Sequence, residues 1–332
     1  MKKENKNMNR KLLSLLLALA LLLTLLPQAA TPARAEDAPV YSGECGDALT
    51  WTFDPDTGTL TIEGSGDMED YRYDSPAPWN DFMTDIQSLS LPEGLSSIGN
   101  QAFEGTWNLQ SVSFPANLTR IGSGAFHGAG LYSVVIPAGV TTIESETFFE
   151  CGSLRSAVIP DTVTYIDRNA FALTSLDSID IPEGVQGLGT MAFGCIDTVS
   201  SVTLPVSLSY IEAAPFCGCR SLEEILVAPG NSDYSTDEYG ALYNAEKTVL
   251  IQYPNGREGD FSVPEGVAYI GLRAFEGCDR RLTELTLPES LTWVGERAFC
   301  SCSALRTVVF PDQVSYVDEQ TFLFCPDLEE LR

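Results

Sequence analysis

Cysteine is the residue type in this chain with the widest range of possible chemistry, because thiolates bind soft metals, attack electrophiles and pair as disulfides. Cys217 with Cys219, and Cys300 with Cys302, have a spacing that could chelate zinc or copper. Five of the nine cysteines share another feature, a position three residues after a phenylalanine: Cys151, Cys219, Cys278, Cys302 and Cys325. This recurrence favours a ladder of buried thiols over a metal site. Disulfides are the alternative, although the odd count leaves one cysteine unpaired.

The other candidates for chemistry are a single histidine and many carboxylates. His127 directly follows a phenylalanine and is expected on an exposed turn, and the chain has neither a nucleophile elbow nor a phosphate-binding loop. Asp233, Asp237 and Glu238 could collect calcium, but their spacing matches no established loop and favours a solvated acidic turn. Other carboxylates recur at turn positions, which is typical of a solvated rim: Glu93, Glu183, Glu265 and Glu289. We therefore expect no enzyme, no cofactor and no bound metal.

These residues are positioned by a repeated sequence unit. A proline is followed eleven residues later by a phenylalanine in all nine complete units, as from Pro115 to Phe126. The period is 22 to 24 residues wherever units are adjacent, which lies inside the ~20–29 residues of leucine-rich repeats. One unit shows the apolar frame: Leu109, Val112, Phe114, Leu118, Ile121, Ala125 and Phe126. Nine recurrences in one register are a highly specific signal of a repeat protein.

The parts of one unit predict its local structure. Val112 and Phe114 alternate with serines, as in a strand with one buried side, and Pro115 ends that strand because it has no amide hydrogen for the ladder. Leu118, Ile121 and Phe126 then place apolar groups inside the returning arm. One unit cannot bury this face alone, so units must stack at ~4.8 Å per strand. The sequence predicts an α/β-type repeat solenoid with about ten short parallel strands and one continuous core.

Two segments do not follow the repeat, and both have the pattern of a β-hairpin. Residues 49–53 and 59–62 alternate in hydrophobicity around a turn at 54–58, and residues 240–243 and 248–251 flank 244–247. The first hairpin is expected to cap the open end of the solenoid, whereas the second is expected to project from it. We therefore predict a β-cap at residues 36–83 and a solenoid at residues 84–332, with a hairpin insert at 229–263.

The first 35 residues have the pattern of a secretory signal. Lys2, Lys3, Lys6, Arg10 and Lys11 precede an uncharged, leucine-rich run at residues 12–26, which is short for a membrane span. Pro27 ends that run, and the small residues 33–35 form a cleavage site. We predict a signal peptide at 1–35, cleavage before Glu36 and no membrane insertion afterwards. An uncleaved membrane anchor is the alternative.

The charge of the chain limits its partners. The formal net charge is −27, and removal of residues 1–35 leaves 13 basic and 45 acidic residues, a charge of −32. A field of this sign repels nucleic acid and anionic membrane surfaces. The expected partners are therefore extracellular proteins or glycans, and the sequence does not define the oligomeric state.

The outward side of the predicted strands is a candidate contact surface. Serine recurs on it, so that it forms a nearly uncharged strip in an acidic protein. Tyr132, Val135, Arg155 and Val158 interrupt the serines on adjacent units, and solenoids commonly bind partners on such extended surfaces. These four residues are the predicted binding site. The alternative is that serine recurs only because it is small and stacks easily.

The repeat also resembles a known family. The entry Gly43-Glu44-Cys45-Gly46 with Leu49-Thr50-Trp51, and the frame Pro-x-x-Val-x-x-Ile-Gly-x-x-Ala-Phe-x-x-Cys, are similar to the BspA-type leucine-rich-repeat family of bacterial surface proteins. The resemblance covers essentially the whole chain after residue 35. It implies exposure at the cell surface or secretion, adhesion to host matrix proteins or other bacteria, and no catalysis.

Two features depart from that family, and a second function stays open. No anchor is visible, and the sequence ends inside the next strand pattern, so we expect either an absent C-terminal part or a final half-coil. Besides an adhesin, a structural element of the envelope without a specific ligand fits the same sequence.

Overall fold

The computed structural model describes residues 41–279 and 282–331 of the 332-residue chain. These residues belong to one compact unit. The predicted signal peptide, residues 1–35, lies outside the described residues. Among the residues described, no helix is long and apolar enough to cross a membrane.

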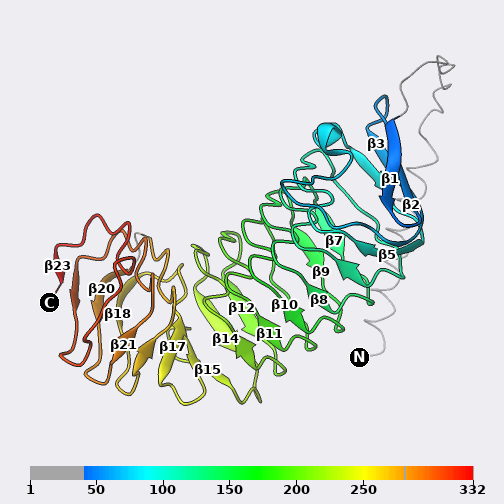
Figure 1. Cartoon of the computed structure of the whole chain (residues 1–332). Helices are drawn as coiled ribbons and strands as arrows, with labels where there is room; N and C mark the ends of the chain where they lie inside the picture. The colour runs from blue at the N-terminus through cyan, green and yellow to red at the C-terminus, as the bar shows by residue number, and fades with distance from the viewer. Residues whose placement is uncertain (1–40, 280–281, 332) are drawn as a thin grey trace, which may run out of the picture. The chain divides into compact units, whose positions relative to one another are not determined.

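Three antiparallel strands precede the first repeat (Figure 1). β1 (Tyr41–Gly46) pairs with β2 (Leu49–Asp54), and β2 pairs with β3 (Thr59–Asp67). Alternate residues of β2 are buried because one of its faces covers the core: Leu49, Trp51 and Phe53. β3 also runs parallel to β4 (Ser88–Ser90) and β5 (Gly94–Ile98), so the antiparallel sheet continues directly into the coils.

The strands that come just before the repeat prolines form the predicted parallel ladder. In β7 (Ser133–Val135) the central Val134 is buried while both neighbours are exposed, which is the expected alternation. The pairings along this side of the coils are all parallel. The strands involved are β7, β9 (Ser156–Val158), β12 (Ser201–Leu204), β14 (Glu224–Val227), β18 (Gly259–Ser262), β20 (Leu282–Thr286), β22 (Thr307–Val309) and β23 (Glu330–Leu331). The prediction of short parallel strands is confirmed.

The returning arm of each coil forms a second parallel ladder, which the sequence analysis did not predict. Its strands are mostly two residues long: β6 (Arg120–Ile121), β8 (Thr142–Ile143), β10 (Tyr165–Ile166), β11 (Gly187–Leu188), β13 (Tyr210–Ile211), β19 (Tyr269–Ile270) and β21 (Trp293–Val294). The α/β label is therefore not upheld. The only helix in the described residues is the three-residue η1 (Asn80–Phe82). The returning arm is instead made of a short strand and hydrogen-bonded turns.

A column of stacked phenylalanines fills the coils. Phe171 is fully buried, and its ring centroid lies 5.3 Å from that of Phe148 and 5.4 Å from that of Phe193. The backbone beside these rings is hydrogen-bonded from coil to coil, as from Phe148 N to Ala170 O at 2.9 Å. Left-handed backbone turns flank the column, and Leu173, with φ of 58°, is one of them. The repeat phenylalanine is thus the main filler of the core, as the sequence predicted.

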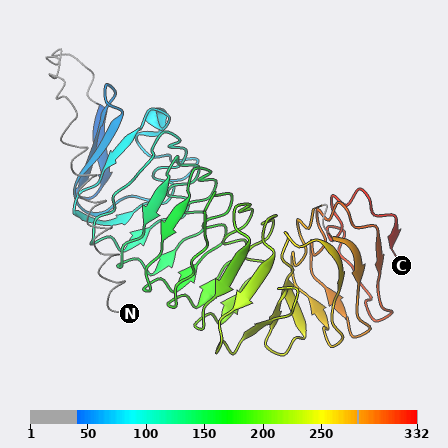
Figure 2. The same ribbon diagram turned by 180° about the vertical axis from the view of Figure 1, so that it is seen from behind.

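The insert is part of the solenoid and does not project from it. β15 (Tyr234–Thr236), β16 (Leu242–Asn244) and β17 (Val249–Gln252) pair antiparallel, and β17 then runs parallel to β19 (Figure 2). Tyr253 takes the place of a repeat phenylalanine, and its ring lies 5.2 Å from that of Phe275. The prediction of a projecting hairpin is wrong because Tyr243 and Tyr253 supply large buried side chains that the coil needs.

The insert also divides the core in two. One buried cluster extends from Cys45 to Leu242 and a second from Ala241 to Val308. At the boundary, side-chain amides take over hydrogen bonds beside the phenylalanine column, since Phe216 N donates to Gln252 Oε1 at 3.1 Å and Gly218 N to Asn255 Oδ1 at 2.9 Å. A backbone bond from Gly256 N to Leu222 O, at 2.7 Å, also crosses it. The predicted single continuous core is therefore two cores joined through polar groups.

Candidate binding surfaces

The four residues of the predicted strip lie together on two adjacent coils. Val135 of β7 is the register partner of Val158 of β9, and both are more than half exposed. Arg155 N donates to Tyr132 O at 2.9 Å, so these two residues are also neighbours across the coils. Tyr132 is likewise more than half exposed. The geometry brings the set together, but the binding role of these residues stays a prediction.

The surroundings of this strip add two features that the sequence did not predict. Arg155 Nη1 lies 3.3 Å from Asp177 Oδ1, so the arginine has an acidic partner on the next coil. Beyond it, the segment 178–181 forms no strand, and a shallow hollow of about 380 Å³ lies between it and β12. Asp180 and Thr203 line that hollow. The strip therefore adjoins a concave polar surface.

The cysteines form the ladder of thiols that the repeat position predicted. All nine are free, and four of the five repeat cysteines are buried, with Cys325 partly exposed. Burial raises the pKa of Cys151 to about 12, which keeps this thiol protonated. Thiols of this column donate to the phenylalanine carbonyl of the coil before, at 3.0 to 3.2 Å: Cys151 to Phe126, Cys219 to Phe193, Cys302 to Phe275 and Cys325 to Phe299. These cysteines therefore satisfy backbone groups in the core.

The histidine and the acidic residues of the insert have structural partners. His127 Nδ1 lies 3.4 Å from Glu104 Oε1 and His127 Nε2 lies 3.6 Å from Glu150 Oε2, so the ring is held between two coils and is only partly exposed. Asp237 accepts hydrogen bonds from Tyr243 Oη and from backbone N–H groups of its own turn. Among the described residues, no group of three or more histidines, cysteines or carboxylates could hold a metal ion.

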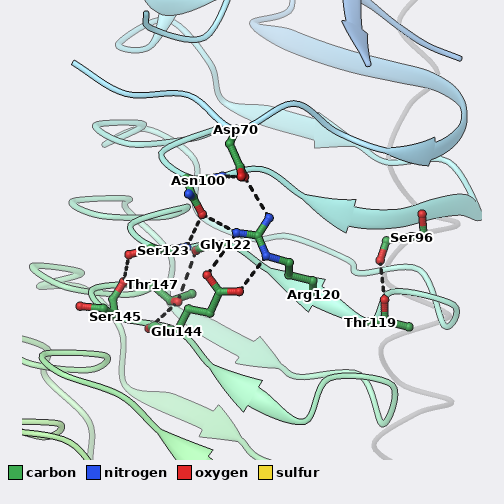
Figure 3. Close-up of polar contacts among 10 residues, drawn as sticks. All are labelled: Asp70, Ser96, Asn100, Thr119, Arg120, Gly122, Ser123, Glu144, Ser145 and Thr147. Carbon is green, nitrogen blue, oxygen red and sulfur yellow. Dashed lines mark hydrogen bonds and ion pairs between the residues drawn. The ribbon is translucent and has the colours of Figure 1, made fainter. Parts of the chain in front are cut away.

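Arg120 joins the antiparallel sheet to the first coils (Figure 3). Its guanidinium donates to Asp70 Oδ1 at 2.9 Å, Glu144 Oε1 at 2.7 Å and Asn100 Oδ1 at 2.6 Å. Burial works to raise the pKa of Asp70, but hydrogen bonds from Arg120 and the Asn100 backbone N–H lower it overall. Because one guanidinium binds both carboxylates and the amide oxygen, and four of its five N–H groups are used in doing so, this cluster is a structural clamp.

A pocket that the sequence did not predict lies between the η1 segment, which follows β3, and the first coil. Its volume is about 340 Å³, and two of its lining residues are strongly exposed aromatics, Tyr73 at 99% and Trp107 at 67%. Asn80 and Gln101 also line it. Trp107 had a sequence signal, because it stands four residues after a repeat phenylalanine, where the later coils have glycine, serine, aspartate, arginine or proline. A large aromatic residue at a surface position that is otherwise small or polar indicates a local function.

The two parallel ladders and the phenylalanine column define a leucine-rich-repeat solenoid. A family model described as "BspA type Leucine rich repeat region (6 copies)" matches residues 82–197, 141–255 and 255–332. These matches cover more than half of the chain. The protein belongs to the BspA-type leucine-rich-repeat family.

Two solved structures are similar over most of the chain. A leucine-rich repeat protein from Eubacterium ventriosum is 21% identical, with a TM-score of 0.59, over 89% of this chain and 85% of that one. A leucine rich cell surface protein from Faecalibacterium prausnitzii is 22% identical, with a TM-score of 0.57, over 90% of this chain and 89% of that one. At these identities the likeness shows the fold alone. No curated protein matches.

Proposed function

We propose that this protein is exported and acts outside the cell as an adhesin that binds host matrix proteins, glycans or other bacteria. Membership of the BspA-type family supports a binding role, and the cell-surface description of the similar Faecalibacterium prausnitzii protein supports the location. The basic and apolar pattern of residues 1–35 supports export. The antiparallel sheet of β1 to β3 covers the first coil and thereby protects its strand edge.

The observation that carries this proposal is the exposed cluster of Tyr132, Val135, Arg155 and Val158. Tyrosine and arginine are the residue types most enriched at binding hot spots, and paired valines supply apolar area beside them. In a protein of charge −27, acidic residues accelerate the approach of a basic partner, but at physiological salt their field fades beyond ~8 Å. A lasting complex therefore needs contact of the kind that the strip offers.

The experiment is a pull-down from host matrix and mucus extracts with the chain that begins at Glu36, followed by surface plasmon resonance on the recovered ligand. Tyr132→Ala with Arg155→Ala is expected to weaken binding tenfold or more, which corresponds to about 1.4 kcal/mol. The matched control is Tyr269→Ala, which removes a similarly exposed tyrosine from the second ladder. Both variants must match the unchanged protein in circular dichroism and melting temperature.

The outcomes separate the candidate functions. Saturable binding that the strip variant loses supports an adhesin acting through this surface. Equal binding by the strip variant and the control would show that the strip is not the contact site. Assembly on the producer's own wall, without a saturable ligand, would favour an envelope scaffold.

Export has its own test. Mass spectrometry of the culture supernatant is expected to find a chain that begins at Glu36 or within a residue or two of it. A full-length chain retained in the membrane would refute the predicted cleavage.

A further inference from the structure

We infer that the pocket between residues 71–84 and 101–107 binds an uncharged sugar at the end of a glycan. This inference rests on the proposed binding function and gives it a ligand class and a second contact site. The pocket volume of about 340 Å³ lies at the lower end of the ~300–1,000 Å³ of small-molecule sites. A site of this size suits the tip of a glycan better than a folded protein surface.

Local structure positions the segments that carry the two exposed aromatic residues. Tyr73 lies in a tight turn closed by two backbone hydrogen bonds, Arg72 N to Ser75 O at 3.1 Å and Ser75 N to Arg72 O at 2.9 Å. The Trp107 indole lies beside Gly105 and Gly128, because a Cβ atom at either glycine would come within 4 Å of its Nε1 atom. The backbone that carries Tyr73 is therefore fixed by its turn, and the Trp107 ring rests against the first two coils, which lowers the entropic cost of binding.

The wall that carries η1 is also tied to the first coil. Asn108 Nδ2 donates to Thr84 O at 2.6 Å, next to Trp107, and Trp79 Nε1 donates to Ala102 O at 2.7 Å beneath the pocket. The Trp79 ring stacks on Phe103 with centroids 5.6 Å apart, so the segment that carries η1 continues the phenylalanine column. The pocket is thus built between two rigidly joined parts of one unit.

The lining has the two kinds of group that sugars require. Flat aromatic faces can cover the C–H face of a sugar ring, while amide and hydroxyl groups can bond its hydroxyls. Asn80, Thr84 and Gln101 bring such polar groups to the pocket, and their side chains make no hydrogen bond to the described part of the chain. An apolar ligand would leave these groups without compensation, whereas sugar hydroxyls satisfy them.

Charge indicates that the sugar is uncharged. The pocket is lined by one arginine and one carboxylate. Arg72 Nε lies 3.7 Å from Asp74 Oδ1, so the arginine has an acidic partner, and Glu104 lies beside the imidazole of His127. The lining therefore offers no unpaired positive charge to select an anionic sugar. The net charge of −27 further disfavours sialylated or sulfated glycans.

The test is a printed array of neutral and acidic glycans from animal, plant and bacterial sources, probed with the chain that begins at Glu36. Binding to neutral glycans is expected, with little to their sialylated counterparts. Tyr73→Ala with Trp107→Ala should reduce that binding at least tenfold. The matched control, Trp293→Ala with Tyr316→Ala, removes two other exposed aromatic residues outside the pocket and should bind as the unchanged protein does.

The outcomes distinguish this inference from the proposed function. Periodate oxidation of the array, which destroys vicinal diols in sugars, should abolish the signal. If no glycan binds while the pull-down yields a saturable protein ligand, the sugar site is refuted and the adhesin proposal stands. Glycan binding that persists in the pocket variant but is lost in the Tyr132 and Arg155 variant also refutes the pocket. If the unchanged protein binds no glycan on the array and recovers no ligand in the pull-down, both proposals are refuted.

Discussion

The phenylalanine column predicts how the cost of one substitution depends on its place in the stack. Phe171 has a ring neighbour on each side, whereas Phe216 has one, Phe193, with centroids 6.1 Å apart. Both rings are fully buried in the same cluster, so replacement by leucine removes the same atoms from the core; Phe216 differs in lying at its boundary, beside Gln252. An aromatic pair contributes about 0.5–1.5 kcal/mol beyond burial. We therefore expect Phe171→Leu to destabilise the protein by about 1 kcal/mol more than Phe216→Leu.

Guanidinium unfolding of the two variants measures this difference. The transition midpoints should differ while the slope of free energy against denaturant stays constant, because the surface exposed on unfolding is nearly the same. Phe193→Leu is the control, since Phe193 has rings on both sides and should behave like Phe171→Leu. Equal costs for all three variants, or a larger cost at Phe216, would refute ring stacking as the cause and leave burial alone.

Three further predictions concern single groups. In the folded protein iodoacetamide should label the partly exposed Cys195 before Cys151, because burial raises the pKa of the Cys151 thiol to about 12. Mass spectrometry should find Cys151 labelled only after guanidinium is added, and equal labelling rates for the two cysteines in the folded protein would contradict the ladder of buried thiols. Because the folded-state pKa of Asp70 is lowered, its carboxylate stabilises the protein above the unfolded pKa of ~3.9, and this stabilisation is lost as the pH falls through the folded pKa. Asp70→Asn should therefore lower the free energy of unfolding, measured in urea, by about 0.5 kcal/mol at pH 7 and by nothing measurable near pH 2. Leu173→Gly should destabilise the protein by about 1 kcal/mol less than Leu226→Gly, because both leucines are 41% exposed but only Leu173, with φ of 58°, has left-handed strain that glycine relieves; equal costs in thermal melts would contradict the argument from backbone strain.

The sequence predicted the repeat because its signal is periodic and redundant. Pro115 and Phe126 bound the returning arm of a coil, and eight other units repeat the same spacing, so a single irregular unit could not obscure the pattern. The second ladder was missed because its strands contain only two residues, as in Tyr165–Ile166, which is too short to show an alternation. The position of Cys151 was predicted correctly because it recurs at a fixed distance from the phenylalanine.

The insert was misinterpreted because hairpin patterns describe pairing and not burial. Residues 240–251 alternate as a hairpin should, and they do pair. Nothing local to them indicates that Tyr243 and Tyr253 replace the repeat side chains inside the coil. That information lies in the absence of a repeat phenylalanine between Phe216 and Phe275, because Phe261 belongs to a strand. The absence leaves a core position that some other residue has to fill. A gap in a repeat is thus itself evidence about the segment that interrupts it.

Departures from the repeat fall into two kinds, and burial distinguishes them. Tyr253 is fully buried at a core position and hydrogen bonds of neighbouring amides join it to the preceding coil, so its role is structural. Trp107 departs from the repeat at a position where side chains face solvent, and two-thirds of it remains exposed. A large exposed aromatic group adds little to the stability of a fold and favours aggregation, so its presence at this position indicates a binding role. That Trp107 and Tyr73 line one pocket could be learned only from the fold. The segment that holds Tyr73 lies outside the repeat, so the sequence gives no register from which its position could be predicted.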